Sequence, residues 1–105
     1  MRVLFDQGTP APLRASLLGH AVDTAYELGW SNFKNGALLD AAEGQGYQVL
    51  VTTDQALRYQ QNLATRQIAI VVLLSTDRRR IQKRIDAVQK AVAAISAGGY
   101  LEVAI

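Results

Sequence analysis

The longest apolar run in the sequence covers residues 68–74, and no polar residue interrupts it. A strand with one face in water alternates apolar and polar side chains, whereas a strand covered by helices on both faces does not. A membrane-spanning helix needs about 20 apolar residues, so this run is too short to be one. We therefore expect a strand at or next to the centre of a parallel sheet, and no transmembrane segment.

Strand-like and helix-like segments alternate around this run. Short apolar or weakly alternating segments indicate four more strands, at residues 3–5, 20–25, 49–51 and 100–105. Helical patterns separate them at residues 10–18, 35–43 and 55–63, and a longer helix is expected between Asp77 and Gly98. This order predicts one α/β domain over residues 1–105, with a three-layer α/β/α fold and a mainly parallel five-stranded sheet.

Two of the helices carry clear local signals. Thr9 is expected to cap the first helix with Pro10 at its first position, and Gly19 is expected to follow its end. The longest helix has one apolar face at steps of four, three, four and three residues, made of Ile81, Ile85, Val88, Val92 and Ile95. That spacing predicts a single continuous amphipathic helix.

Composition limits the chemistry that the chain can carry. Half of the residues are hydrophobic and 19% are charged, which is typical of a domain with a packed core. The absence of cysteine excludes disulfide bonds, thiolate zinc sites and cysteine nucleophiles. The first residues lack the pattern of a cleaved secretion signal, so we expect a cytoplasmic protein.

Three aspartates follow predicted strands. Asp6, Asp54 and Asp77 each lie at the carboxyl end of one, and ligands of open α/β sheets bind at that edge. Carboxylates gathered there repel each other unless a cation or a proton neutralises them, so Asp6 and Asp54 are interpreted as the core of a magnesium or manganese site. The alternative is that each aspartate caps the following helix, and for Asp77 capping is the favoured interpretation.

Basic residues crowd the second half of the chain, although the net charge is only +2. The candidates for contacts with nucleic-acid phosphates are Arg58, Arg78, Arg79 and Lys83. The last three also belong to the polar side of the predicted long helix, so a solvated helix face is the alternative interpretation.

Aromatic residues and the single histidine offer weaker signals. Trp30, Phe33 and Tyr47 have rings that can stack on nucleic-acid bases, although ordinary packing is the favoured interpretation. His20 lies between a predicted helix end and a predicted strand, where no partner for catalysis is apparent, and it is interpreted as structural.

Four short blocks carry a family resemblance. They are residues 3–10 (Val-Leu-Phe-Asp-Gln-Gly-Thr-Pro), 18–22 (Leu-Gly-His-Ala-Val), 27–29 (Glu-Leu-Gly) and 49–54 (Val-Leu-Val-Thr-Thr-Asp). In this order they resemble the compact PIN-like proteins of prokaryotes, which are relatives of the VapC-type toxin ribonucleases. Together the four blocks cover about the first sixty residues in register.

The resemblance implies an α/β/α fold whose strand-end carboxylates hold Mg²⁺ or Mn²⁺ for hydrolysis of RNA. Asp6 and Asp54 match the family's first and later aspartates, with Asp77 or Glu27 as further aids in positioning the cation. Asn35 stands where the family has a carboxylate on the second helix, and Gln7 replaces a glutamate. An amide oxygen can still ligate a hard cation, so Asn35 is kept as a ligand candidate and weak metal binding is expected.

The resemblance also implies partners. Small toxins of this family pair with an antitoxin protein and generally form homodimers, so both partners are expected here together with RNA. Two other functions remain open. One is a catalytically degenerate member of the same fold that binds RNA or a protein partner. The other is a receiver-like signalling domain with Asp54 as phosphoacceptor, which the absence of a lysine on the last strand disfavours.

Overall fold

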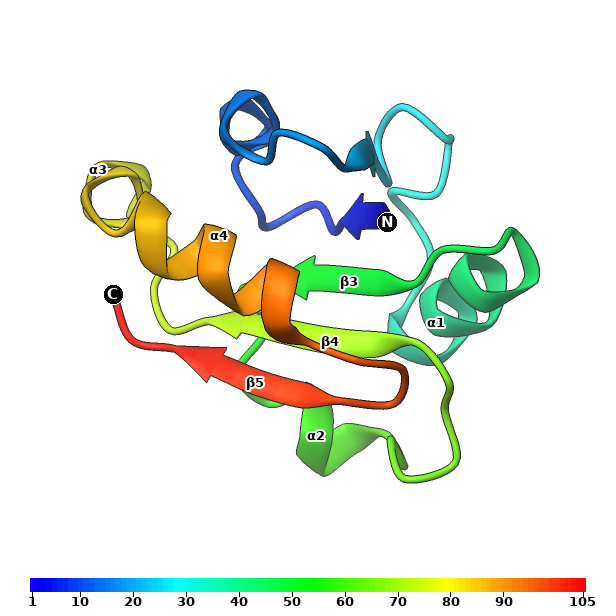
Figure 1. Cartoon of the computed structure of the whole chain (residues 1–105). Coiled ribbons are helices and arrows are strands. Elements are labelled where there is room, and N and C mark those ends of the chain that lie inside the picture. The colour runs from blue at the N-terminus through cyan, green and yellow to red at the C-terminus, as the bar shows by residue number, and fades with distance from the viewer.

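The structure is a computed structural model that describes all residues, 1–105. Its centre is a five-stranded sheet in the order β2-β1-β3-β4-β5, in which every neighbouring pair is parallel (Figure 1). The strands are β1 (Arg2–Phe5), β2 (Ala21–Thr24), β3 (Val49–Thr52), β4 (Ala69–Leu73) and β5 (Tyr100–Val103). The expected α/β fold and the five expected strands are confirmed, and the apolar run forms β4 beside the central β3.

Both faces of the sheet are buried because successive side chains of a strand point to opposite sides. Val49 and Val51 belong to one core cluster, whereas Leu50 between them belongs to the other. Strand β4 divides in the same way, with Val71 in the first cluster and Val72 in the second. This double burial explains why the central strands have uninterrupted apolar sequences.

Helices cover the two faces and make the fold three-layered. On one face lie the 3-10 helix η1 (Ala11–Ser16), α3 (Arg78–Lys83) and α4 (Ile85–Ala94), whose buried residues join the first cluster. On the other face α1 (Asn35–Gly44) and α2 (Leu57–Gln60) join the second cluster. Figure 1 shows α4 lying across the sheet, with α1 and α2 on the side away from it. None of these helices has the length and apolar content that a bilayer crossing requires.

The first helix differs from its prediction. It is a 3-10 helix that starts at Ala11, and Pro10 occupies its cap position without a side-chain bond. The expected cap, Thr9, is buried, and its hydroxyl instead lies 2.9 Å from the carbonyl oxygen of Val51. The capping group is thus used in a contact with β3. Gly19 follows as expected, with a φ of 84° that favours glycine.

Two further helices also differ from their predictions. The long helix is divided at Arg84, whose backbone angles of −113° and 25° separate α3 from α4. Its apolar stripe is nevertheless buried on one face of the sheet. The helix expected over residues 55–63 has only the four residues of α2. Leu57 is the only residue of α2 that is buried in the core, so tertiary packing gives a longer helix little support.

An acidic pair at the carboxyl edge of the sheet

Asp6 and Asp54 follow β1 and β3, two adjacent strands between which the strand order reverses. Strand β1 connects onward to β2 on one side, whereas β3 connects onward to β4 on the other. Such a reversal leaves a crevice at the carboxyl ends of the strands, where open α/β sheets bind ligands. The two loops approach each other closely there, because a Cβ added to Gly8 would lie 2.6 Å from the Thr53 hydroxyl oxygen.

Two threonine hydroxyls hold the carboxylate of Asp6. Thr52 donates to its Oδ2 atom, and the Thr9 hydroxyl oxygen lies 2.7 Å from its Oδ1 atom. Burial raises the pKa of Asp6, and the neighbouring charge of Asp54 raises it further, while the two hydroxyls act in the opposite direction. Burial is the largest of these effects, so the pKa of Asp6 is raised overall.

The Thr9 hydroxyl faces two acceptors at the end of the central strands. The Thr9 hydroxyl has one proton, yet its oxygen lies within bonding distance of both Asp6 Oδ1 and the Val51 carbonyl oxygen. An ionised carboxylate and a carbonyl are both acceptors, so one proton cannot serve both fully. The Thr9 hydroxyl thus contacts both the Asp6 carboxylate and the end of β3, and it holds the loop after β1 against β3.

Asp54 is held by a different set of donors. Its Oδ1 atom accepts the backbone N–H of Ala56 over 3.0 Å, and its Oδ2 atom accepts the Nδ2 amide of Asn35 over 3.0 Å. The backbone N–H of Asp54 donates to the Thr52 hydroxyl over 3.0 Å, and that hydroxyl donates in turn to Asp6. Thr52 therefore connects the carboxylate of Asp6 to the backbone of Asp54.

The residues present fit a magnesium or manganese ion of modest affinity. No group of three or more acidic, histidine or cysteine side chains lies close enough together to hold a metal ion. Magnesium, however, often binds through one or two carboxylates and keeps several waters. Asp6 and Asp54 supply two carboxylates. Asn35 supplies an adjacent amide, whose N–H group donates to Asp54 in this structure.

Asp77 shares no hydrogen-bond partner with Asp6 or Asp54. It is the N-cap of α3, where its Oδ1 atom accepts the backbone N–H groups of Arg79 and Arg80 over 2.9 and 3.2 Å. Its carboxylate therefore does what the capping interpretation expected, and it does not complete a three-carboxylate cluster with Asp6 and Asp54.

The basic candidates occupy two places on the same edge. Arg78, Arg79 and Lys83 are exposed on α3, directly after the carboxyl end of β4, and none forms a salt bridge. Arg58 lies on α2, where its guanidinium donates to the Tyr59 hydroxyl over 2.6 Å and lies 3.8 Å from Glu102.

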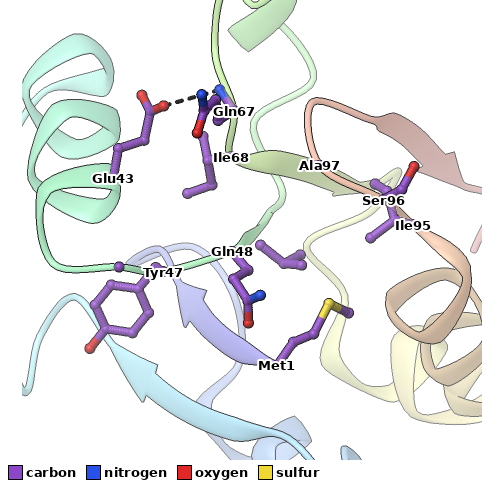
Figure 2. A pocket seen from close by; sticks show the side chains of 11 residues that line it. Met1, Glu43, Tyr47, Gln48, Gln67, Ile68, Ile95, Ser96 and Ala97 are labelled. Atoms are coloured by element: carbon purple, nitrogen blue, oxygen red, sulfur yellow. Dashed lines mark hydrogen bonds between the residues drawn. The ribbon is translucent and has the colours of Figure 1, made fainter.

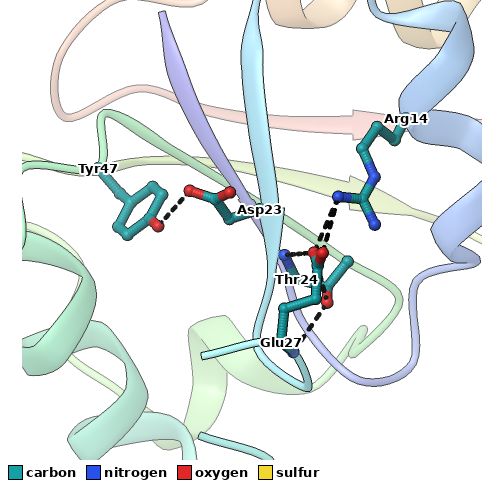
Figure 3. Close-up of polar contacts among 5 residues, drawn as sticks. All are labelled: Arg14, Asp23, Thr24, Glu27 and Tyr47. Carbon is teal, nitrogen blue, oxygen red and sulfur yellow. Dashed lines mark hydrogen bonds and ion pairs between the residues drawn. The ribbon is translucent and has the colours of Figure 1, made fainter. Parts of the chain in front are cut away.

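Asp6 also lines a hollow of about 360 Å³, which lies between the loops that follow β1 and β2. Its polar wall contains Arg14 and Glu27, which form an ion pair of 2.9 Å. Glu27 also accepts the backbone N–H and the hydroxyl of Thr24 over 3.0 and 3.1 Å (Figure 3). The Arg14 contact and the Thr24 donors lower the pKa of Glu27, so it stays charged and engaged with Arg14.

Packing accounts for the three aromatic candidates. Trp30 stacks on Phe33 with ring centroids 5.9 Å apart and meets the Tyr47 ring edge-on at 6.2 Å. The Tyr47 hydroxyl donates to Asp23 over 2.5 Å, as Figure 3 shows. His20 accepts from the amino group of Met1 at 3.3 Å, consistent with its structural interpretation.

A second hollow, of about 350 Å³, lies at the opposite, amino edge of the sheet (Figure 2). Its most polar wall residue, Glu43, already accepts Arg66 over 2.7 Å and the backbone N–H of Gln67 over 3.1 Å. This satisfied carboxylate ties α1 to the segment before β4, and it adds no chemistry to the acidic pair.

Sequence reasoning missed the residues that organise the pair. The sequence predicts Thr9 only as a helix cap and gives no role to Thr52 or to Gln60, which accepts the second N–H of Asn35 over 2.9 Å. A hydroxyl residue at the end of a buried strand beside a strand-end aspartate is the signal that was available. A scan against protein-family models, a search of curated proteins and a search of solved structures each found no match.

Proposed function

We propose that the protein is a PIN-like phosphodiesterase that uses Mg²⁺ or Mn²⁺ to hydrolyse RNA. The supporting observation is the placement of Asp6 and Asp54 after β1 and β3, where the strand order reverses, with the Thr52 hydroxyl bonded to the Asp6 carboxylate and to the Asp54 backbone N–H. Two carboxylates at a ligand-binding edge are a suitable anchor for one hydrated hard cation. The four-block sequence resemblance adds independent support, and a cytoplasmic homodimer with an antitoxin partner belongs to the same proposal.

Each residue of the pair has a distinct role in this proposal. Asp6 and Asp54 hold the cation through ionised carboxylates, because metal ligands must be deprotonated. Thr52 holds the Asp6 carboxylate beside the backbone of Asp54, while Asn35 fixes the orientation of the Asp54 carboxylate. When bound, the ion lowers the pKa of a coordinated water and stabilises the charge that develops on the scissile phosphate.

A second candidate function is binding of RNA or a protein partner without cleavage. The observation that favours it is the contact between Asn35 and Asp54, because an N–H donor already neutralises part of the charge that would attract a cation. The receiver-like alternative has less support, since β5 ends at Val103 and is followed by Ala104 and Ile105 without a lysine.

Calorimetric titration with MnCl₂ tests the first candidate directly. The parent protein is expected to bind weakly, and Asp6→Asn and Asp54→Asn are expected to abolish binding. Asp86→Asn is the matched control, because Asp86 is an exposed aspartate on α4 without a salt-bridge partner. An RNA-cleavage assay with and without Mn²⁺ then separates the two functions. Unchanged manganese affinity in Asp6→Asn would show that the pair is not the metal site.

A further inference from the structure

Strand β5 forms one edge of the sheet, because β4 is its only neighbour (Figure 1). The carbonyl oxygens of Gly99 and Val103 accept N–H groups of β4 and of the residue that follows it, over 2.9 and 3.0 Å. Because bonding to the neighbour alternates along a strand, Tyr100 and Glu102 direct their N–H and C=O groups away from the sheet. No loop, turn or side chain of the protein bonds these outward groups.

The opposite edge, β2, is partly occupied by the chain itself. Thr24 is the outward-facing residue at its end, since Ala25 beyond it donates to Phe5 of β1 over 2.9 Å. The Thr24 N–H donates to the Glu27 carboxylate over 3.0 Å (Figure 3), and its carbonyl oxygen accepts the Leu28 N–H over 3.2 Å. Strand β5 is therefore the edge that can accept another strand along its full length.

The side chains of β5 do not protect this edge. Its sequence, Tyr-Leu-Glu-Val, lacks the proline and lysine with which natural edge strands prevent pairing. Leu101 is 39% exposed on the face that carries α4, because Val103, two residues later, packs into the first cluster. On the other face the Arg58 guanidinium lies 5.8 Å from the centre of the Tyr100 ring and 3.8 Å from the Glu102 carboxylate.

We propose that β5 pairs antiparallel with β5 of a second copy of this chain, so that two sheets join into one. A two-fold axis at Leu101 brings this residue opposite its own copy and brings each Tyr100 opposite Glu102 of the partner subunit. The Tyr100 and Glu102 positions then form hydrogen-bonded pairs, which use all their outward N–H and C=O groups. Leu101 forms the non-hydrogen-bonded pair between them, where side chains approach most closely.

Other positions of the axis use the edge less well. An axis at Glu102 places two carboxylates directly opposite each other, and like charges in that arrangement are destabilising. An axis at Tyr100 places Leu101 opposite Gly99, which has no side chain to pack against it. An axis at Val103 places Tyr100 opposite a position beyond the end of β5. Leu101 is therefore the position that the sequence of β5 favours.

Charge complementarity supports the same arrangement. Each Glu102 then lies opposite the partner's Tyr100, on the face of the sheet where Arg58 lies beside that ring. Arg58 of one copy is thus next to a carboxylate of the other, and the contact occurs twice because of the two-fold symmetry. The second copy therefore supplies an anion to a cation that is 3.8 Å from an anion of its own chain.

The arrangement is closed and small. The two β5 edges cover each other, and Thr24 leaves little of the β2 edges free, so association ends at two copies. Four-residue strands make a small interface beside the about 1,600 Å² of a standard one, so the dimer is expected to exchange with the monomer. The inference rests on the proposed function only for the homodimer, and it requires neither metal binding nor RNA cleavage.

Sedimentation velocity over a series of protein concentrations tests the pairing. The parent is expected to approach twice the chain mass of 11.4 kDa as the concentration rises. Leu101→Lys places two lysines opposite each other at the axis, and it is expected to remain monomeric throughout the series. Leu18→Lys is the matched control, because Leu18 is 84% exposed and precedes β2, and it should dimerise like the parent. Thermal melts establish that both variants are folded.

Exchange of charges tests the register. Arg58→Glu and Glu102→Arg each place like charges across the interface, so each variant alone is expected to dimerise less than the parent. An equimolar mixture of the two variants pairs opposite charges again and should regain dimerisation. A mixture that dimerises no better than its components would overturn the proposed register.

The result is separable from that of the proposed function. A parent that stays monomeric, or one whose dimerisation Leu101→Lys leaves unchanged, would overturn the inference whatever the manganese titration shows. Loss of the dimer in Leu101→Lys together with recovery in the mixture supports it, even if the parent binds no manganese. In that last case the pairing stands and the phosphodiesterase does not.

Discussion

The side-chain amide of Asn35 donates one N–H to Asp54 Oδ2 over 3.0 Å and the other to Gln60 Oε1 over 2.9 Å. Because Asn35 is the first residue of α1 and Gln60 the last of α2, this one side chain joins two helices to the acidic pair. It also provides a donor where the resembled family has a carboxylate. Asn35 is therefore the position at which metal binding and stability are most directly opposed.

Replacing Asn35 by aspartate is expected to destabilise the metal-free protein and to strengthen metal binding. The variant loses both donated bonds and places a third carboxylate beside Asp54, at a cost of about 1–3 kcal/mol. Ionised oxygen is a better ligand for hard cations than an amide N–H, so the Mn²⁺-induced rise in Tm should exceed that of the parent. Thermal melts with and without MnCl₂ measure both effects.

Asn62→Asp is the control for this experiment, because exposed Asn62 accepts the Ala64 backbone N–H through Oδ1 and an aspartate can do the same. It adds a negative charge away from the site, and its metal-induced shift should equal that of the parent. If Asn35→Asp shows no larger shift than Asn62→Asp, then Asn35 does not contribute to a cation site.

The raised pKa of Asp6 predicts a stability that falls with increasing pH. The folded protein binds the Asp6 proton more tightly than the unfolded chain does, so this stabilisation is complete below the ordinary aspartate pKa of about 3.9. It is lost as the pH rises through the raised folded-state pKa, at about 1.4 kcal/mol for each pKa unit.

Urea unfolding across a pH series, with Asp6→Asn beside the parent, measures this effect. The amide cannot ionise, so the parent's stability minus that of the variant should decrease above about pH 4 and then level off. Other titrating groups cancel in the difference. A difference that stays constant from pH 4 to neutrality would mean that burial of Asp6 does not favour its neutral form.

Thr52→Val is expected to lower the free energy of unfolding by about 1–3 kcal/mol, because it removes the hydrogen-bond partner of Asp6 Oδ2 and of the Asp54 N–H. Thr52 is 1% exposed and valine has nearly the same shape, so the loss reports the hydroxyl. Thr52→Ser should recover most of the stability. Chemical denaturation distinguishes this from a packing effect, in which the serine variant would be the less stable one.

Asp77→Ala is expected to cost about 0.5–2 kcal/mol through loss of the cap of α3. Asp77→Ser retains a side-chain acceptor and should recover most of that stability. Neither variant should alter the Mn²⁺-induced rise in Tm, as measured by the same thermal melts. A selective loss of that rise in Asp77→Ser would instead assign the carboxylate to the metal site.

The sheet could be predicted because its signals are local. The uninterrupted run at β4 and the short apolar segments at β1 and β3 record burial on both faces, and the structure places these strands side by side. The position of the aspartates at strand ends followed from the same reasoning. Because parallel strands end at one edge, Asp6 and Asp54 could be expected together without any knowledge of their partners.

The helices and the bonds of the site were less predictable because they depend on tertiary contacts. No glycine or proline marks the interruption of the long helix at Arg84. The Thr9 hydroxyl does form a hydrogen bond to the backbone, but its partner is Val51 on β3 and not the first turn of a helix. The partner of Asn35 could not be known either, since Gln60 joins it only through the packing of α1 and α2.

The pairing of β1 with β3 has a consequence for how the protein folds. Thr52 and Asp6, which this pairing brings together, are 46 residues apart, whereas all other neighbouring strands join segments closer in sequence. Closing the longest chain loop has the highest entropic cost of any contact in the sheet. The acidic pair is therefore expected to form only once the whole chain between its loops is ordered, so a partly folded intermediate would lack the site even where β3 and β4 have already paired.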